Sequence, residues 1–297
     1  MHRSYTNSTL LIGSALVACL CARPNLAEAQ NHYPGGIEGI KAASLPPPGF
    51  YLRDYNLVYF ADRVNDAAGH RVPMDFSVTA YAQAIRPIWI TDWQVLGGSV
   101  GLDVLVPFIY TDFKAGGYKD SAFGLGDICI EVPTISWHGQ CYDFGVGYAI
   151  WAPTGEFDRT RPEKPGKGFW SHMLTAGGTW YPTEDKAWSL SVLNRYEIHM
   201  RDEAGYTPGN TLTTEFGIGR AVCKTAELGV IGYYQQQTTD DSGRGSKPHN
   251  RVFGVGPEIS VAIPKWAMFI SARYAREFGA EDTSEGNTVT VTLTKKL

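Results

Sequence analysis

The stretch WSLSVLNRYEIHMR (188–201) gathers side chains that could do chemistry. Arg195, Glu197 and His199 offer a cation, a carboxylate and an imidazole, which are groups that general acid–base catalysis uses. They stand two residues apart and alternate with apolar residues. Because successive side chains of a β-strand point to opposite faces, this spacing predicts one polar wall of a strand more readily than a catalytic cluster.

The spacing of histidines, serines and cysteines does not indicate an enzyme or a metal site. An outer-membrane phospholipase of twelve strands places a serine two residues after a histidine, because the imidazole must activate the hydroxyl. No histidine after residue 30 has a serine in that position, and no C-x-x-C pair follows the first 21 residues. We therefore expect no catalytic residue, no metal and no cofactor.

The N-terminus has the pattern of a secretory signal peptide. Arg3 precedes the apolar run TLLIGSALVACLC (9–21), and small residues flank Glu28 in Ala27-Glu28-Ala29. This predicts removal of residues 1–29. A lipoprotein cleavage before Cys19 is the alternative. The formal net charge of −4 shows no basic excess, so nucleic acid is not an expected partner.

The rest of the chain alternates with period two. In 72–84 the even positions are apolar and the odd positions largely polar, and 141–152 repeats the pattern. Alternation of this kind predicts strands with one apolar face. The chain after residue 30 holds no apolar run long enough for a transmembrane helix.

Twelve strands and their connections predict an all-β fold, a transmembrane antiparallel up-and-down β-barrel. The expected strands are 50–60, 72–85, 94–112, 122–137, 141–153, 169–183, 187–201, 210–223, 226–239, 250–263, 266–278 and 286–297. Short connections, such as 86–93, alternate with long ones, such as 113–121 and 279–285. Short periplasmic turns and longer extracellular loops produce this rhythm. All eight tryptophans lie near expected strand ends, as membrane-interface girdles require. A soluble β-sandwich is the alternative.

Charged residues on the polar face of the expected strands should line the lumen, because a charge on the lipid-facing side near the middle of the bilayer is costly. The expected lumen-lining residues are Asp75, Asp103, Asp127, Asp143, Arg195, Glu197, His199, Arg201, Glu215, Glu258, Arg273 and Glu277. Salt bridges across the lumen are expected among Arg195, Glu197, Arg273 and Glu258.

Residues 30–49 precede the expected barrel of residues 50–297 and do not alternate. Pro46-Pro47-Pro48 favours an extended polyproline conformation. The segment is either a periplasmic lead-in or a plug that enters the lumen. The loop 154–168, flanked by Trp151 and Trp170, is a candidate for folding inward.

Several motifs in order resemble one outer-membrane family. They are LPPPGFYLRDYN (45–56), GLGDI (124–128), WAPTGEFD (151–158), NRYE (194–197), TPGN (207–210) and QTTDDSG (237–243). Together they resemble the "MetA-pathway of phenol degradation" family of outer-membrane transporters. The resemblance implies a channel-like barrel that takes up small hydrophobic or aromatic compounds, phenol-like or fatty-acid-like, and it implies no catalytic residues.

The expected function is therefore an outer-membrane channel with a small hydrophobic or aromatic ligand. A structural or adhesive barrel and, less favoured, a lipid-modifying enzyme are the alternatives. Expected partners are outer-membrane lipids and the barrel assembly machinery, and a monomer is compatible with a barrel of this size. Barrels of this kind usually end in an aromatic residue, whereas this chain ends in Leu297.

Overall fold

The computed structural model describes residues 31–203, 205–243 and 249–297, and its regular structure is almost wholly antiparallel β-sheet. The predicted signal peptide lies outside the described residues. The strands are β1 (Gly49–Val64), β2 (Phe76–Val95), β3 (Gly98–Ala115), β4 (Tyr118–Leu125), β5 (Ile128–His138), β6 (Tyr142–Ala152), β7 (Ser171–Trp180), β8 (Trp188–His199), β9 (Thr211–Cys223), β10 (Ala226–Gln237), β11 (Arg251–Ile263), β12 (Met268–Glu281) and β13 (Ser284–Lys296). None of the described residues forms a helix long and apolar enough to span a membrane.

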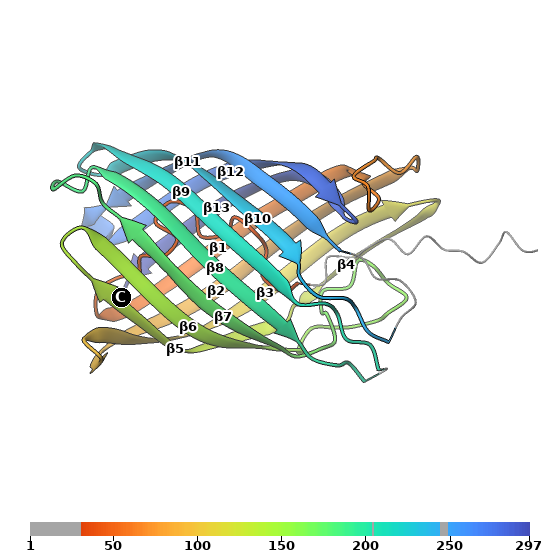
Figure 1. The fold of residues 1–297 in the computed structure, drawn as a ribbon, viewed down its shortest axis with the longest axis horizontal. Coiled ribbons are helices and arrows are strands. Elements are labelled where there is room, and N and C mark those ends of the chain that lie inside the picture. The colour runs from red at the N-terminus through yellow and green to blue at the C-terminus, as the bar shows by residue number, and fades with distance from the viewer. Residues whose placement is uncertain (1–30, 204, 244–248) are drawn as a thin grey trace, which may run out of the picture.

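Twelve of these strands close into a ring (Figure 1). β1 pairs with both β2 and β13, and β3 pairs with β2 on one side and β5 on the other. β4 is additional: it pairs with Phe108–Ala115, the second half of β3. Closure gives the backbone groups of the ring neighbours on both sides, which a bilayer requires of spanning strands. The predicted fold class is confirmed.

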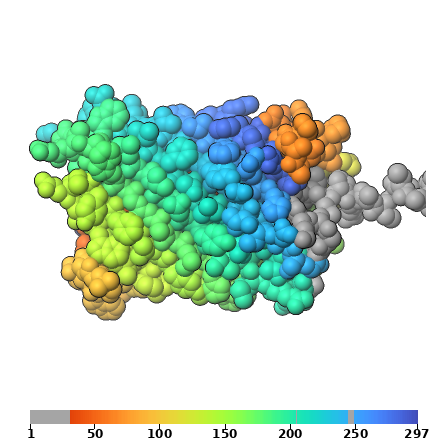
Figure 2. Space-filling view, in the orientation of Figure 1, coloured from red at the N-terminus to blue at the C-terminus, as the bar shows by residue number. Residues whose placement is uncertain are grey.

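The barrel has two different ends. The turn end carries the short connections 96–97, 139–141, 181–187 and 224–225, and the loop end carries the connections 65–75, 153–170, 200–210 and 238–250. On the face drawn in Figure 2, the strands from the middle of the chain onward, green to blue, form a continuous wall between the two ends.

The expected short connection at 86–93 is wrong. Those residues lie within β2, and the turn is Leu96-Gly97, where both residues have positive φ as a tight hairpin requires. Pro87 lies within this stretch of β2. Pairing with β3 is interrupted between Ile85 and Ile88, while Pro87 still pairs with Leu52 of β1. A proline has no amide hydrogen to donate, and it is tolerated here because the pairing between β2 and β3 skips its position.

Three other boundaries also differ from the expectation. The strand expected at 122–137 is divided into β4 and β5 by Gly126 and Asp127. The amide of Gly126 donates to the carbonyl of Pro107, which turns the chain between the two strands. The connections expected to be long at 113–121 and 279–285 are two-residue turns, at 116–117 and 282–283.

The two faces of the wall follow the predicted parity. In β8, Ser191, Arg195 and Glu197 are buried in the lumen, whereas Leu190 and Val192 are exposed on the outer face. Six tryptophans are exposed on the outside, as girdle residues should be: Trp89, Trp93, Trp170, Trp180, Trp188 and Trp266. Trp151 departs from the expected girdle because it points inward and is buried.

Asn194 is a polar residue on the outer face of β8. Its side-chain oxygen accepts a hydrogen bond from the Thr214 hydroxyl of β9 at 2.8 Å. This neighbour satisfies the amide oxygen on a surface that otherwise faces lipid, so a cross-strand pair explains the asparagine.

We predict that the cost of a charge on the outer face depends on depth. Val230, in the middle of β10, and Val222, at the turn end of β9, are 51% and 55% exposed. In lipid, Val230→Arg should destabilise the barrel by about 2–4 kcal/mol and Val222→Arg by about 0–1 kcal/mol. Equal losses in urea titrations of the two variants in liposomes would rule out a bilayer around this wall.

Candidate functional site

Residues 31–48, which we call the plug, run through the inside of the barrel (red to orange in Figure 1). At the loop end, the His32 amide donates to Glu197 of β8 at 3.0 Å. Towards the turn end, the Ser44 hydroxyl donates to Asp143 of β6 at 2.7 Å. Of the two interpretations of residues 30–49, the described part of the segment therefore takes the plug position.

The wall holds the plug through its backbone. Carboxylates of three strands accept amide hydrogens of the plug: Glu197 from His32, Glu215 from Glu38 at 3.1 Å, and Glu258 from Ile40 at 2.7 Å. These bonds use backbone groups that every residue except proline carries, and they satisfy buried amides that would otherwise be orphaned. The wall glutamates thus fix the path of the plug with little demand on its side chains.

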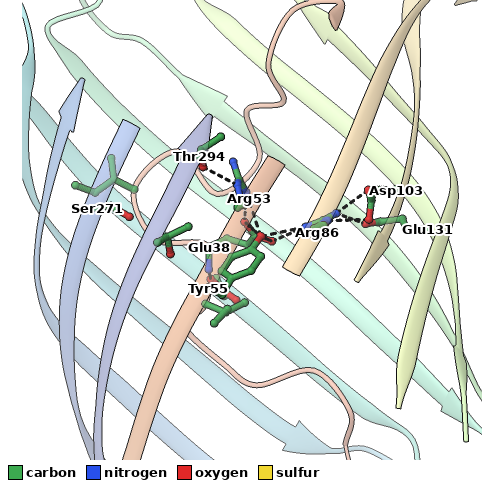
Figure 3. A network of polar contacts seen from close by, with 12 residues as sticks. Glu38, Arg53, Tyr55, Arg86, Asp103, Glu131, Ser271 and Thr294 are labelled. Atoms are coloured by element: carbon green, nitrogen blue, oxygen red, sulfur yellow. Dashed lines mark hydrogen bonds and ion pairs between the residues drawn. The ribbon is translucent and has the colours of Figure 1, made fainter. Parts of the chain in front are cut away.

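Glu38 is the centre of the polar contacts in Figure 3. Its carboxylate lies 2.8 Å from Arg53, 3.1 Å from Arg86 and 3.3 Å from Arg195, and the Tyr55 hydroxyl donates to it at 3.1 Å. Burial raises the pKa of this carboxyl group, but the surrounding guanidinium groups outweigh burial and lower the pKa to about 2. Glu38 is therefore ionised at neutral pH.

Arg86 connects the plug to two acids of the wall. It makes a bidentate contact with Asp103 of β3, at 2.7 and 2.9 Å, and reaches Glu131 of β5 at 2.6 Å. We call Glu38, Arg53, Arg86, Arg195, Asp103 and Glu131 the ionic network. Three cations face three carboxylates, so the formal charges within this network balance.

A second polar cluster lies at the loop end, around His32. Its Nε2 is 3.1 Å from Asp127 and its Nδ1 is 3.1 Å from the Ser171 hydroxyl, which is also 2.7 Å from Nδ1 of His199. Burial lowers the pKa of His32, but the carboxylates of Asp127 and Glu197 outweigh it and raise the pKa.

Asp127 also holds the loop between β6 and β7. Its carboxylate accepts the amide hydrogens of Gly155 at 2.9 Å and Lys167 at 2.7 Å. Pro165 of the same loop faces the barrel cavity described below. One carboxylate thus joins an outer loop to the plug.

The order hydroxyl, imidazole, carboxylate in Ser171, His32 and Asp127 is that of a catalytic triad. Ser171, however, is 0% exposed, so no substrate carbonyl reaches its hydroxyl. A G-x-S-x-G spacing also occurs at 97–101, which the expectation of no catalytic motif overlooked. It spans the hairpin between β2 and β3, whereas a nucleophile elbow joins a strand to a helix.

Two cavities in the described part of the chain flank the ionic network, one on each side of it. The larger, of about 120 Å³, extends from the network towards the loop end, and its surface is mainly apolar. Its apolar lining includes Leu57, Ala84, Leu105, Ile109 and Trp151. The smaller, of about 50 Å³, lies towards the turn end, beside Ser44 and Leu45. Both are lined by Glu38, Arg86, Glu131 and Arg195, which therefore separate them.

Most residues expected to line the lumen are buried inside the barrel. They are Asp103, Asp127, Asp143, Arg195, Glu197, His199, Glu215, Glu258, Arg273 and Glu277. Two are not: Asp75 precedes β2, is 68% exposed and pairs with Lys114, and Arg201 is exposed beyond the end of β8. Both lie past the strand ends, where side chains no longer alternate between the lumen and the outer face.

The expected salt-bridge group is divided by the plug. Glu258 and Arg273 are cross-strand neighbours and pair at 3.4 Å. Arg195 and Glu197 instead contact the plug, through Glu38 and His32. Sequence reasoning placed Arg86 in a turn and did not single out Arg53 or Glu38. Alternation gives no clear signal for Arg53, because the polar residues Asp54 and Asn56 follow it on the opposite face of β1.

Comparisons with known proteins support the fold. A family model described as "Putative MetA-pathway of phenol degradation" matches residues 61–293. The fold is similar to that of an outer membrane channel from Pseudomonas putida F1, with a TM-score of 0.77 and 13% identity over 90% of this chain and 100% of that chain. The fold is also similar to that of the beta domain of the Bordetella autotransporter BrkA, with a TM-score of 0.52 and 10% identity over 84% of this chain and 100% of that chain. The translocator domain of the autotransporter NalP from Neisseria meningitidis is similar with a TM-score of 0.50 and 11% identity, over 86% of this chain and 91% of that chain. No curated protein sequence matches the chain.

We predict that Arg86→Met destabilises the protein strongly. The change leaves the carboxylates of Asp103 and Glu131 buried without this partner, and breaking a buried ion pair costs about 3–5 kcal/mol. Arg71→Met, at an exposed position of the loop end, should change stability by less than about 0.5 kcal/mol. Urea unfolding in lipid measures both, and equal effects would show that the ionic network does not stabilise the fold.

We also predict a pH dependence for Glu38→Gln. The pKa of Glu38 is about 2 in the folded protein, below its ordinary value of 4.5. The carboxylate therefore contributes stability that is fully present above pH 4.5 and is lost as the pH falls through 2. The difference in unfolding free energy between wild type and variant should be constant from pH 7 to 5 and shrink from 4.5 to 2. The same difference at pH 7 and pH 2 would contradict this prediction.

Proposed function

The chain belongs to the family described as "Putative MetA-pathway of phenol degradation", and from this premise we propose that it is an outer-membrane channel for small hydrophobic compounds with one aromatic ring. The observation that carries the proposal is the cavity of about 120 Å³ at the loop end. An engineered apolar cavity of roughly 150 Å³ holds benzene, so a cavity of this size suits a single ring.

The chemistry of the cavity favours a neutral ligand. Its charged lining residues are held by partners: Arg86 by Asp103 and Glu131, and Asp127 by His32 and two loop amides. The surface left for a ligand is mainly apolar. A ring that buries its apolar area there gains roughly 25 cal/mol per Å², while an ion must also give up its hydration.

The plug and the ionic network lie across the path from this cavity to the turn end. A ligand that leaves the first cavity meets Glu38, Arg86, Glu131 and Arg195 before it reaches the second. Passage therefore requires the plug to move. This supports a ligand-selective channel that is closed at rest over a permanently open water-filled pore.

We place the barrel in the bacterial outer membrane, with the turn end in the periplasm. The exposed apolar outer wall and the tryptophans near strand ends fit contact with lipid. The Pseudomonas putida protein of similar fold is itself an outer membrane channel. Outer-membrane lipids, the barrel assembly machinery and a monomeric state complete the proposal.

The buried position of Ser171 supports a channel over an enzyme. A hydrolase of the triad type needs its hydroxyl within reach of a bound carbonyl group. Here Ser171 binds two imidazoles and lies behind His32, which itself lines the cavity.

We predict that filling the cavity slows transport. Ala84 faces the cavity, and its neighbour Ile85 is exposed on the outer wall. Ala84→Phe should lower the flux of phenol or toluene into proteoliposomes by about tenfold or more, because a barrier about 1.4 kcal/mol higher already gives tenfold. Ile85→Phe, with the same new side chain on the opposite face, should leave flux unchanged. Equal flux in protein-free and wild-type liposomes for every aromatic compound tried would remove the transport function.

A further inference from the structure

We propose that His32, Glu197 and His199 form a binding site for one divalent transition-metal ion, best matched by Zn²⁺, that fastens the plug to the barrel wall. Two imidazoles and a carboxylate are a common ligand set for such ions. His32 belongs to the plug, whereas Glu197 and His199 belong to β8. The proposal goes beyond the transport function, although His32 also lines the larger cavity.

The ligand atoms are already close together. One ligand atom from each residue lies within 4.8 Å of the others, and His32 Nδ1 is 3.7 Å from Glu197 Oε1. Bonds of about 2.0–2.1 Å in tetrahedral geometry place ligand atoms roughly 3.3 Å apart. Shifts of about 1 Å or less in the side chains therefore complete the three-ligand site.

The surrounding groups orient the imidazoles. Asp127 is 3.1 Å from Nε2 of His32, and because a carboxylate only accepts, this contact keeps a proton on Nε2 and turns Nδ1 towards Glu197. A carboxylate on the second ring nitrogen is the usual support of a metal-bound histidine. Ser171 lies between the Nδ1 atoms of His32 and His199, so its hydroxyl or a water molecule can complete the coordination.

The site is shielded from water, and its carboxylates match the charge of a divalent ion. The side chains of His32 and Glu197 are each only 1% exposed. Trp151 stacks on His32 at 5.3 Å between ring centroids, and Phe169 contacts the rings of both histidines edge-on. The carboxylates of Glu197 and Asp127 together offset the charge of a divalent ion. Since Asp127 also holds loop amides, a bound ion joins the plug, β8 and the outer loop.

Metal binding to the full mature chain, folded in detergent, tests the site. Zn²⁺ alone is titrated calorimetrically into wild type, His32→Ala, His199→Ala and Asp127→Asn. The control is His172→Ala, which removes an imidazole from the outer face of the neighbouring strand β7, where it bonds Tyr148. We expect one Zn²⁺ per wild-type chain and unchanged binding by the control.

Loss of an orienting group typically lowers metal affinity by about 10–100-fold, so we expect Asp127→Asn to lose Zn²⁺ affinity within that range. His32→Ala and His199→Ala, which remove ligands, should lose affinity by about 100-fold or more. No Zn²⁺ binding by wild type, or the same loss in His172→Ala as in His32→Ala, would overturn the proposal. Altered gel mobility on boiling identifies the variants that fold.

X-ray absorption by Zn²⁺ on the wild-type protein gives a test that needs no variant. We expect two imidazole nitrogens and oxygen ligands at about 2.0–2.1 Å. A spectrum with fewer than two imidazoles, or with sulfur, contradicts the assignment to these three residues.

Discussion

The structure depends on the ionised carboxylate of Glu38 among three guanidinium groups in the middle of the barrel. A buried charge is tolerated only with partners, because removing an ion from water costs several kcal/mol even after relaxation. Each arginine of this set in turn needs an acid, and Arg86 finds two in Asp103 and Glu131. The plug therefore does more than fill the lumen: its one carboxylate completes the charge balance of the ionic network. Withdrawing it leaves cations facing one another.

The barrel supplies the geometry for this arrangement. Period two sends alternate side chains inward, and register sets which of them meet, as in the cross-strand pair of Glu258 and Arg273. The ionic network divides the interior into an apolar cavity towards the loop end and a smaller one towards the turn end. Asp127 adds a connection at the loop end, because it binds both the plug and the loop between β6 and β7. Asp127 therefore connects the plug directly to that loop.

The closed barrel and the inward face of β8 could be predicted because both follow from a local pattern, alternation within one strand. Arg86 was expected in a short connection, whereas it lies within β2, which continues past Pro87 while its pairing with β3 skips that position. The grouping of His32 with Glu197 brings together residues 165 positions apart, and Glu38 lies in a segment without period. Contacts between the plug and the wall depend on three-dimensional closure, which spacing along the chain does not encode.

Single-channel conductance of the folded protein in planar bilayers tests the central claim most directly. The claim is that the plug, fixed through Glu38, closes the path between the two cavities. A variant that lacks residues 31–44 and still changes gel mobility on boiling should conduct ions well above the level of the full chain, because the lumen then fills with water. Equal conductance with and without those residues would contradict the claim that the plug closes the channel.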